Sequence, residues 1–100
     1  MIAEIQCLPT PSGTPTDRYA HVDAAIAVVV ASGLHHEVGP LGTSFEGPPD
    51  AVWPVLRAAH EACLAAGATS VVTVVKVAEG GAGGADTGPA IDDLVGKHRP

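Results

Sequence analysis

A turn signal between two short strands constrains the fold of this chain more than any other feature. Residues 36–47 read His-Glu-Val-Gly-Pro-Leu-Gly-Thr-Ser-Phe-Glu-Gly, and Gly39-Pro40-Leu41-Gly42 separates two runs with strand character. Glycine tolerates positive φ and proline pre-sets φ, so this combination is typical of a chain reversal. We therefore expect a hairpin at the centre of a small α+β sheet, with polar residues forming one wall of a ligand or subunit surface.

Capping and turn residues delimit two helices around this hairpin. Thr16 is a good N-cap with Asp17 in the first turn, and Gly33 follows the last turn of the same helix. Asp50 is the expected N-cap of a second helix, with Pro54 in or just after its first turn. The expected elements are a strand over 2–8, a helix over 17–32, strands over 34–38 and 42–46, a helix over 50–66, a Val-rich strand over 69–77 and a short helix over 91–97.

The order β-α-β-β-α-β is that of a ferredoxin-like sandwich. We predict an α+β fold with a four-stranded antiparallel sheet, strand order fourth-first-third-second, and two helices on one face. The ferredoxin-like domain is expected over 1–79, and 80–100 is expected to be a Gly-rich loop and a short helix or tail. The density of valine in 69–77 is typical of a central or doubly covered strand.

Alternation and helical spacing assign the apolar residues to a core between sheet and helices. The residues expected to face the core are Ala3, Ile5, Cys7 and Phe45 on strands, Tyr19, Val22, Ile26, Val29 and Val30 on the first helix, and Val52, Val55, Leu56, Ala59, Cys63 and Ala66 on the second. The opposite, open face is expected to carry Glu4, Gln6, Ser44, Glu46, Val72, Val74 and Lys76.

Three charged residues are expected to meet at one corner of the open face. The start of the first strand lies beside the ends of both its neighbours, so Glu4, Glu46 and Lys76 should converge there. Such a cluster is either a structural part of a subunit interface or a polar site for an amine or a cationic ring. Glu37 joins this face only if Val38 points toward the helices.

Charge and composition exclude several classes of partner. The net charge is −6 with only five Lys plus Arg, so nucleic-acid binding is not expected. No apolar run is long enough to span a membrane and no signal peptide is recognised, so we expect a cytoplasmic protein. Apolar residues make up 46% of the chain but are mostly Ala and Val, which favours a homo-oligomer over a monomer with a tightly packed core.

No cofactor, metal or catalytic centre is predicted. Cys7 and Cys63 are expected to be buried free thiols, because neither has a second ligand at metal spacing. His35 and His36 are adjacent on a strand and point to opposite faces. A structural hydrogen bond is expected for His60 and a solvated position for His21. No nucleophile with a base and an orienting residue can be assembled, so an enzyme is not expected.

Several segments together resemble a known family. The opening Met-Ile-Ala-Glu-Ile, the motif at 37–47, Ala-His-Glu-Ala at 59–62 with Ala-Ala-Gly-Ala at 65–68, and the strand ending in Lys76-Val77 occur in its order and spacing. In these the chain is similar to the small thiamine-binding proteins over roughly residues 1–79. It departs from them after Val77, where a Gly-rich run replaces a charged segment, and at His36, which fills the place of an aromatic residue.

The resemblance implies function as well as fold. It implies ferredoxin-like dimers that pair through their sheets, often assembled into tetramers, and non-catalytic binding of thiamine or a hydroxymethylpyrimidine-type ligand. From the family motif and the open face together, we expect the ligand-binding residues to be Glu4, Glu37, Thr43, Ser44, Glu46 and Lys76. The alternative is an oligomeric regulatory or interaction module without a small ligand; an unrecognised enzyme is a third possibility.

Overall fold

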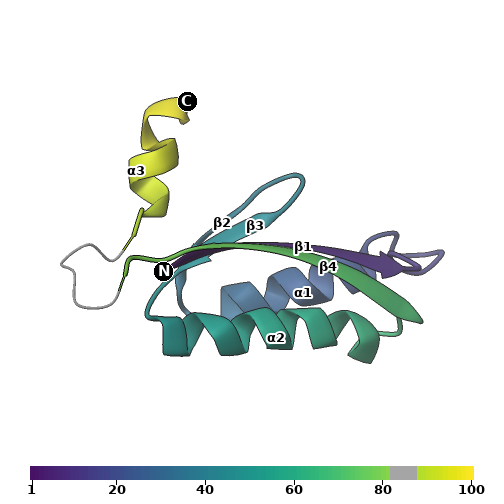
Figure 1. Ribbon diagram of the computed structural model, residues 1–100. Helices are drawn as coiled ribbons and strands as arrows, with labels where there is room; N and C mark the ends of the chain where they lie inside the picture. Colours follow the sequence, from purple (N-terminus) through teal and green to yellow (C-terminus); the bar gives the residue numbers. More distant parts are fainter. Residues whose placement is uncertain (82–87) are drawn as a thin grey trace.

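The sheet has four antiparallel strands in the order β2-β3-β1-β4, and α1 and α2 both lie against one of its faces (Figure 1). The computed structural model describes residues 1–81 and 88–100. Its elements are β1 (Ile2–Thr10), α1 (Ala20–Ala31), β2 (His35–Val38), β3 (Thr43–Glu46), α2 (Pro49–Ala65), β4 (Ser70–Ala78), α3 (Ile91–Val95) and a 3₁₀ turn (Gly96–His98). The predicted α+β ferredoxin-like sandwich and its strand order are confirmed.

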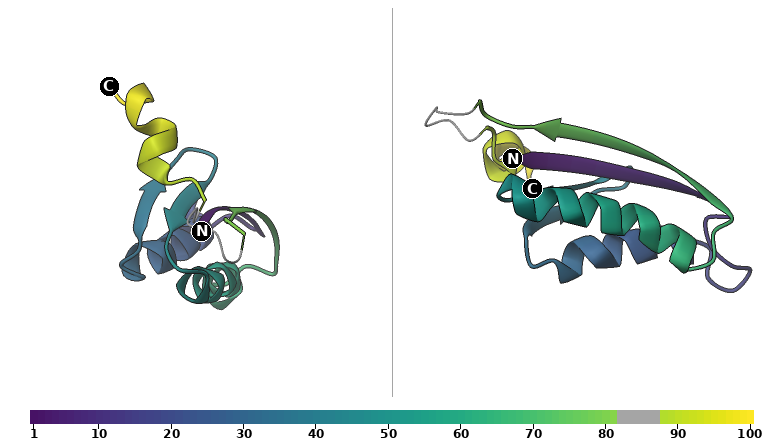
Figure 2. Two further views of the ribbon diagram at one scale, coloured as in Figure 1. Left: turned by 60° about the vertical axis from the view of Figure 1, so that its left-hand side comes forward. Right: turned by 60° about the horizontal axis from the view of Figure 1, so that its bottom comes forward.

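Two views turned from the first show the two layers and the position of the third helix (Figure 2). The α1 and α2 helices lie side by side under the sheet, whereas α3 lies on the opposite side of the sheet, near the start of β1. None of the described helices is long and apolar enough to cross a membrane. The division of the chain between residues 79 and 80 remains a prediction, and most of the Gly-rich run, residues 82–87, lies outside the described residues.

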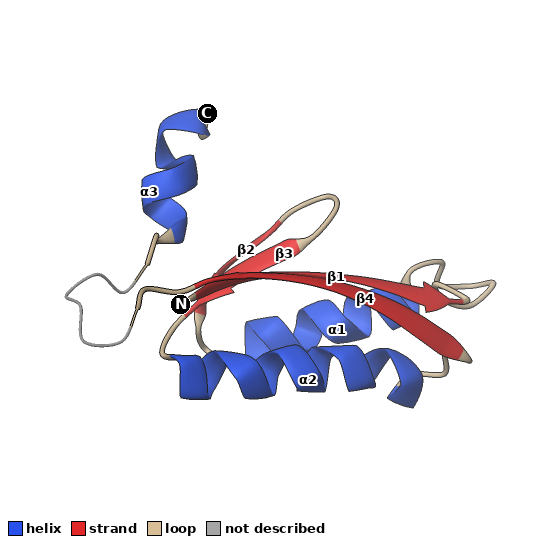
Figure 3. Ribbon diagram, viewed as in Figure 1, coloured by secondary structure: helices blue, strands red, loops and turns tan. Residues whose placement is uncertain are grey.

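Alternation along the strands separates a dry face from an open face. Ala3, Ile5 and Cys7 are buried on the helix side, as predicted. Phe45 is fully buried on the same side of β3, which leaves Ser44 on the open face. The hairpin contributes the inner strand β3 and the edge strand β2, so it forms one flank of the sheet (Figure 3).

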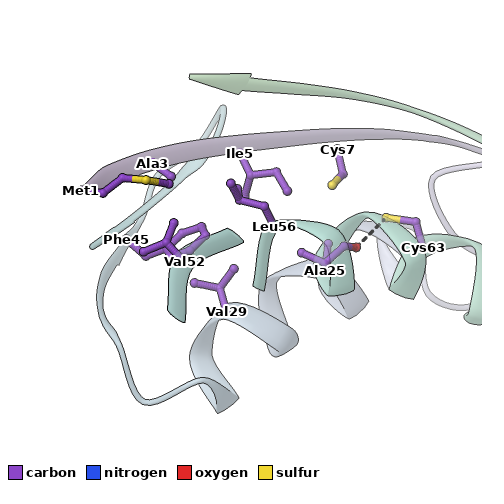
Figure 4. Close-up of a cluster of buried hydrophobic side chains, with 11 residues drawn as sticks. Met1, Ala3, Ile5, Cys7, Ala25, Val29, Phe45, Val52, Leu56 and Cys63 are labelled. Carbon is purple, nitrogen blue, oxygen red and sulfur yellow. Dashed lines mark hydrogen bonds between the residues drawn. The ribbon is translucent and has the colours of Figure 1, made fainter. Parts of the chain in front are cut away.

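The core is built from small and medium side chains. Figure 4 shows Phe45 beside Val52 and Val29, with Ile5 above Leu56. Cys63 is buried farther along α2, where its thiol donates to the carbonyl of Ala59. Burial, followed by the neighbouring Cys7, raises the pKa of Cys63 to about 11, which keeps this thiol protonated at neutral pH.

The first helix begins later than predicted. It starts at Ala20, because residues before it form a turn in which the amide of Asp17 donates to the hydroxyl of Thr14 over 3.0 Å. The main-chain carbonyl of Ser12 then accepts from the amide of His21. The expected N-cap at Thr16 is therefore wrong, since the chain is still turning at that residue.

The buried stripe of α1 is also rotated from the predicted one. His21, Ala25 and Val29 are buried, whereas Tyr19 is 56% exposed and Val30 is exposed. Nδ1 of His21 donates to the carbonyl of Pro11 over 2.7 Å, which corrects the expected solvated position. The turn before α1 thus covers the side chain of His21 and supplies the carbonyl that accepts its hydrogen bond, so this polar side chain is buried with its hydrogen bond made.

The second helix and the last strand each contain one correction. Pro48, not Asp50, is the N-cap of α2, because Pro49 is well suited to the first helical position. The predicted stripe is otherwise found, except that Ala66 is exposed at the C-cap. The β4 strand is an edge strand, and Val75 and Val77 remain exposed although they face the helix side. Its valines reflect β-propensity and not burial on both faces.

Two further local predictions are found in the structure. Cys7 and Cys63 are free and buried. His60 and Thr73 share a hydrogen bond of 2.6 Å between Nδ1 and Oγ1, and Thr73 in turn donates to Sγ of Cys7. This chain of contacts joins α2 to the sheet.

The core predicts a large stability difference between two truncations. Phe45→Ala removes a fully buried ring and should lower the free energy of unfolding by about 3–5 kcal/mol. Leu41→Ala removes a side chain that is 79% exposed and should change it by no more than about 0.5 kcal/mol. Urea denaturation followed by circular dichroism measures both. Equal effects of the two truncations would contradict this account of the core.

Candidate ligand site

Four polar residues form a row across the open face of the sheet. Glu37 lies opposite Ser44, Ser44 opposite Glu4, and Glu4 opposite Lys76. The row therefore crosses all four strands at one level. Each of its members was among the residues expected to bind a ligand, and side chains directly opposite on one face lie close enough to act together.

Glu4 and Lys76 form a loose ion pair within this row. Nζ of Lys76 lies 3.9 Å from Oε1 of Glu4, and the two side chains are largely solvent-accessible. A pair of this kind contributes at most about 1 kcal/mol. The Glu4 carboxylate is consequently available to a competing cation.

Glu46 takes a different position from the expected corner with Glu4 and Lys76. It lies one row away, opposite Ile2 and His35. Its Oε2 accepts the main-chain N–H of Ile91 over 3.0 Å, and its Oε1 lies 3.8 Å from Nε2 of His35. The register brings Glu4 and Lys76 together, while the C-terminal segment engages Glu46.

Glu37 lies on the open face because Val38 pairs with Thr43 on the other side. Its carboxylate is occupied by Arg99, whose Nη2 and Nε donate to Oε1 over 2.8 and 3.0 Å. Nη1 of Arg99 donates to Asp92 over 2.9 Å. Arg99 therefore ties the end of the chain to β2.

The C-terminal contacts form a compact charged cluster of Glu37, Glu46, Asp92, His35 and Arg99. The hydrogen bond from Arg99, followed by that from His35, holds the pKa of Asp92 below its ordinary value. Hydrogen bonds to Glu37 and then to Asp92 raise the pKa of Arg99. Ile91, at the start of α3, is almost completely buried, so an apolar contact accompanies the polar ones.

Thr43 stands apart from the other candidates. It is buried on the helix-facing side of β3, beside Phe45, as alternation indicates. It therefore cannot share the open-face row with Ser44.

His36 donates a hydrogen bond through Nδ1 to the carbonyl of Leu34. No group of three or more metal-binding side chains is found in the described ranges 1–81 and 88–100.

Sequence reasoning missed the part played by Arg99 and Asp92. No periodic pattern indicates where the short C-terminal helix packs, because residues 91–99 are joined to the sheet by side-chain contacts over more than forty positions. Ile91, an apolar residue at the start of a short polar helix, was the one available signal.

A comparison with protein families matches residues 3–85 to a family described as "Thiamine-binding protein". A UPF0045 protein of Clostridium perfringens is 33% identical over 91 residues, covering 89% of this chain and 88% of the relative.

Solved structures show the same fold. A domain of unknown function, DUF77, from Bacillus cereus is 35% identical, with 99% of this chain and 91% of that chain covered and a TM-score of 0.76. A solved structure from Thermotoga maritima, described as that of a candidate thiamine biosynthesis or salvage protein, has a TM-score of 0.75. It is 22% identical, with 98% of this chain and 97% of that chain covered.

The charged cluster predicts how the C-terminal segment is held. Arg99→Ala removes the hydrogen bonds to Glu37 and Asp92, so exchange of the Ile91 amide with deuterium should accelerate several-fold. Lys97→Ala is the matched control, since Lys97 is a cation of the same segment and forms no ion pair among the described residues. Equal protection of Ile91 in both variants and in the parent chain would contradict this role.

Acid should release the segment in the same way. A carboxylate whose pKa is depressed on folding contributes fully above its ordinary pKa, and the contribution is lost as the pH falls through the folded-state value. Protection of Ile91 should therefore decline below about pH 3.8, the ordinary pKa of Asp92, in the parent chain and less in Asp92→Asn.

Proposed function

Because this chain belongs to the thiamine-binding protein family, we propose that it binds thiamine or a hydroxymethylpyrimidine-type ligand without chemical conversion. The observation that carries this proposal is the row of Glu37, Ser44, Glu4 and Lys76 across the open face. Carboxylates and a hydroxyl complement a positive thiazolium ring and an exocyclic amine.

Glu4 is the carboxylate that we expect to receive the positive charge. Glu37 and Glu46 are engaged by Arg99 and by the Ile91 amide, whereas Glu4 has only the long contact with Lys76. In this proposal Ser44 and Lys76 flank the ligand. The contribution of Glu37 and Glu46 depends on whether the C-terminal segment stays in place.

Titration calorimetry tests the proposal. The parent chain should bind both thiamine and hydroxymethylpyrimidine with a saturable heat. Glu4→Gln keeps the size of the side chain but removes its charge, so thiamine affinity should fall by about 2- to 5-fold, the range of a partly exposed charge pair. Affinity for the neutral hydroxymethylpyrimidine should change by less.

Glu61→Gln is the matched control for this experiment. Glu61 is an exposed carboxylate on α2 that pairs with Arg57, on the far side of the sheet from the row. It should leave both affinities unchanged. Absence of any saturable heat or thermal shift with either compound at millimolar concentration would reject the proposed function.

A second function, a self-associating module without a small ligand, is favoured by the apolar end of the open face. Leu8, Val72 and Val74 are 49%, 64% and 45% exposed there. Leu8 lies directly opposite Val72. Neighbouring apolar side chains of this size mark a contact surface. We propose that two copies pair through this face, in which case the polar row of Glu37, Ser44, Glu4 and Lys76 is part of the subunit interface.

Light scattering tests the pairing. The parent chain should be a dimer or a larger oligomer at micromolar concentration, and Val74→Lys should shift it toward the monomer because a charge would be buried in the interface. Val30→Lys, a substitution of an equally exposed valine on α1, should leave the oligomer intact. A monomeric parent chain would reject this second function.

A further inference from the structure

A groove of about 270 Å³ lies between β1, the start of α1 and the hairpin turn. Its walls are mostly apolar, with Tyr19, Val22 and Ile26 from α1 and its preceding turn on one side. Gly42 and Thr43 line it from the hairpin. Thr43 is the candidate ligand residue that lies on the helix-facing side of the sheet, and the groove is the cavity that this residue lines.

The groove exists because β1 is much longer than β3. The β3 strand pairs with β1 only from Ile2 to Ile5, whereas β4 follows β1 to Thr10. Figure 3 shows the hairpin diverging from β1 toward its turn. One edge of β1 from Gln6 onward therefore faces the groove instead of a neighbouring strand.

Main-chain hydrogen-bonding groups of Cys7 point to this uncovered edge. The amide of Gly47 donates to the carbonyl of Met1, which places the main-chain groups of Met1 on the β3 side. Main-chain direction alternates along a strand, so Ala3, Ile5 and Cys7 have the same direction as Met1. Cys7 is the first of these beyond the end of β3, and its N–H and C=O present an adjacent donor and acceptor to the groove.

We propose that this groove receives the aminopyrimidine ring of the ligand, with the cationic ring of thiamine directed toward Glu4. The identity of the ligand rests on the proposed function. An aminopyrimidine has a ring nitrogen that accepts a hydrogen bond next to an exocyclic amine that donates one. This pair complements the N–H and C=O of Cys7 in the way that an added strand does. A flat ring also fits between apolar walls with the exposed ring of Tyr19 at the rim.

Gly42 connects the groove to the open face. A Cβ atom built at Gly42 would lie 3.2 Å from both Cγ and Cδ of Glu4, so the glycine leaves room for the Glu4 side chain at the groove's rim. Gln6, the next open-face residue of β1, also lines the groove. One ligand can therefore contact Thr43 and Glu4 although the two residues lie on opposite faces of the sheet.

The test fills the groove and leaves the open face unchanged. Val22→Phe places a larger side chain in the groove wall, and Val30→Phe is the same substitution on the same helix outside the groove. Calorimetric titration with thiamine and with 4-amino-5-hydroxymethyl-2-methylpyrimidine should show at least a tenfold loss of affinity for both compounds in Val22→Phe. Val30→Phe should stay within twofold of the parent chain.

A second pair of variants keeps the test valid if Val22→Phe fails to fold, as judged by circular dichroism. Tyr19→Ala removes the rim ring and should weaken both compounds about threefold or more, whereas Trp53→Ala, an exposed aromatic on α2, should not. If the parent chain binds thiamine and every groove variant that folds keeps parental affinity, the groove assignment is overturned and the proposed function stands. If the parent chain binds neither compound, both are overturned.

Discussion

The pairing of β1 with a strand on each side is the interaction on which the rest of the structure depends. It joins β3, from the middle of the chain, to β4, which follows α2, over a large sequence separation. The same strand buries Ala3, Ile5 and Cys7 against the helices. This one nine-residue strand therefore supplies both the central hydrogen bonding of the sheet and much of the apolar surface buried beneath it.

The unequal length of the strands beside β1 creates the groove on which the proposed ligand site depends. A β3 strand as long as β4 would satisfy the edge of β1 completely and would close the groove beside Cys7. The hairpin turn instead lies just before Thr43, where β3 begins, and Gly42 leaves space for Glu4 at that point. The proposed site, which combines main-chain groups, apolar walls and a carboxylate, therefore lies where the sheet ladder stops.

The C-terminal segment adds a polar contact to an otherwise open surface. Arg99 on Glu37 and the Ile91 amide on Glu46 engage two of the three carboxylates on this part of the sheet. Glu4 is left with a loose contact to Lys76. An acidic face on an acidic chain is in this way partly neutralised by the chain itself, and the remaining carboxylate is the one nearest the groove.

The sequence by itself determined the order of elements and the faces of β1 and β3, because alternation and turn chemistry are local properties of the chain. The strand order followed from the sheet that a β-α-β-β-α-β order typically forms. The sequence also determined that Ser44 and Phe45 point to opposite faces. It placed the α1 stripe wrongly, since a turn held by Thr14 and Ser12 sets where the helix starts and buries His21. Only the tertiary structure decided that Glu46 and Glu37 receive the C-terminal segment, that Glu37 joins the open row, and that β3 ends short of Cys7. These are matters of register and long-range packing, in which residues meet that no local pattern relates.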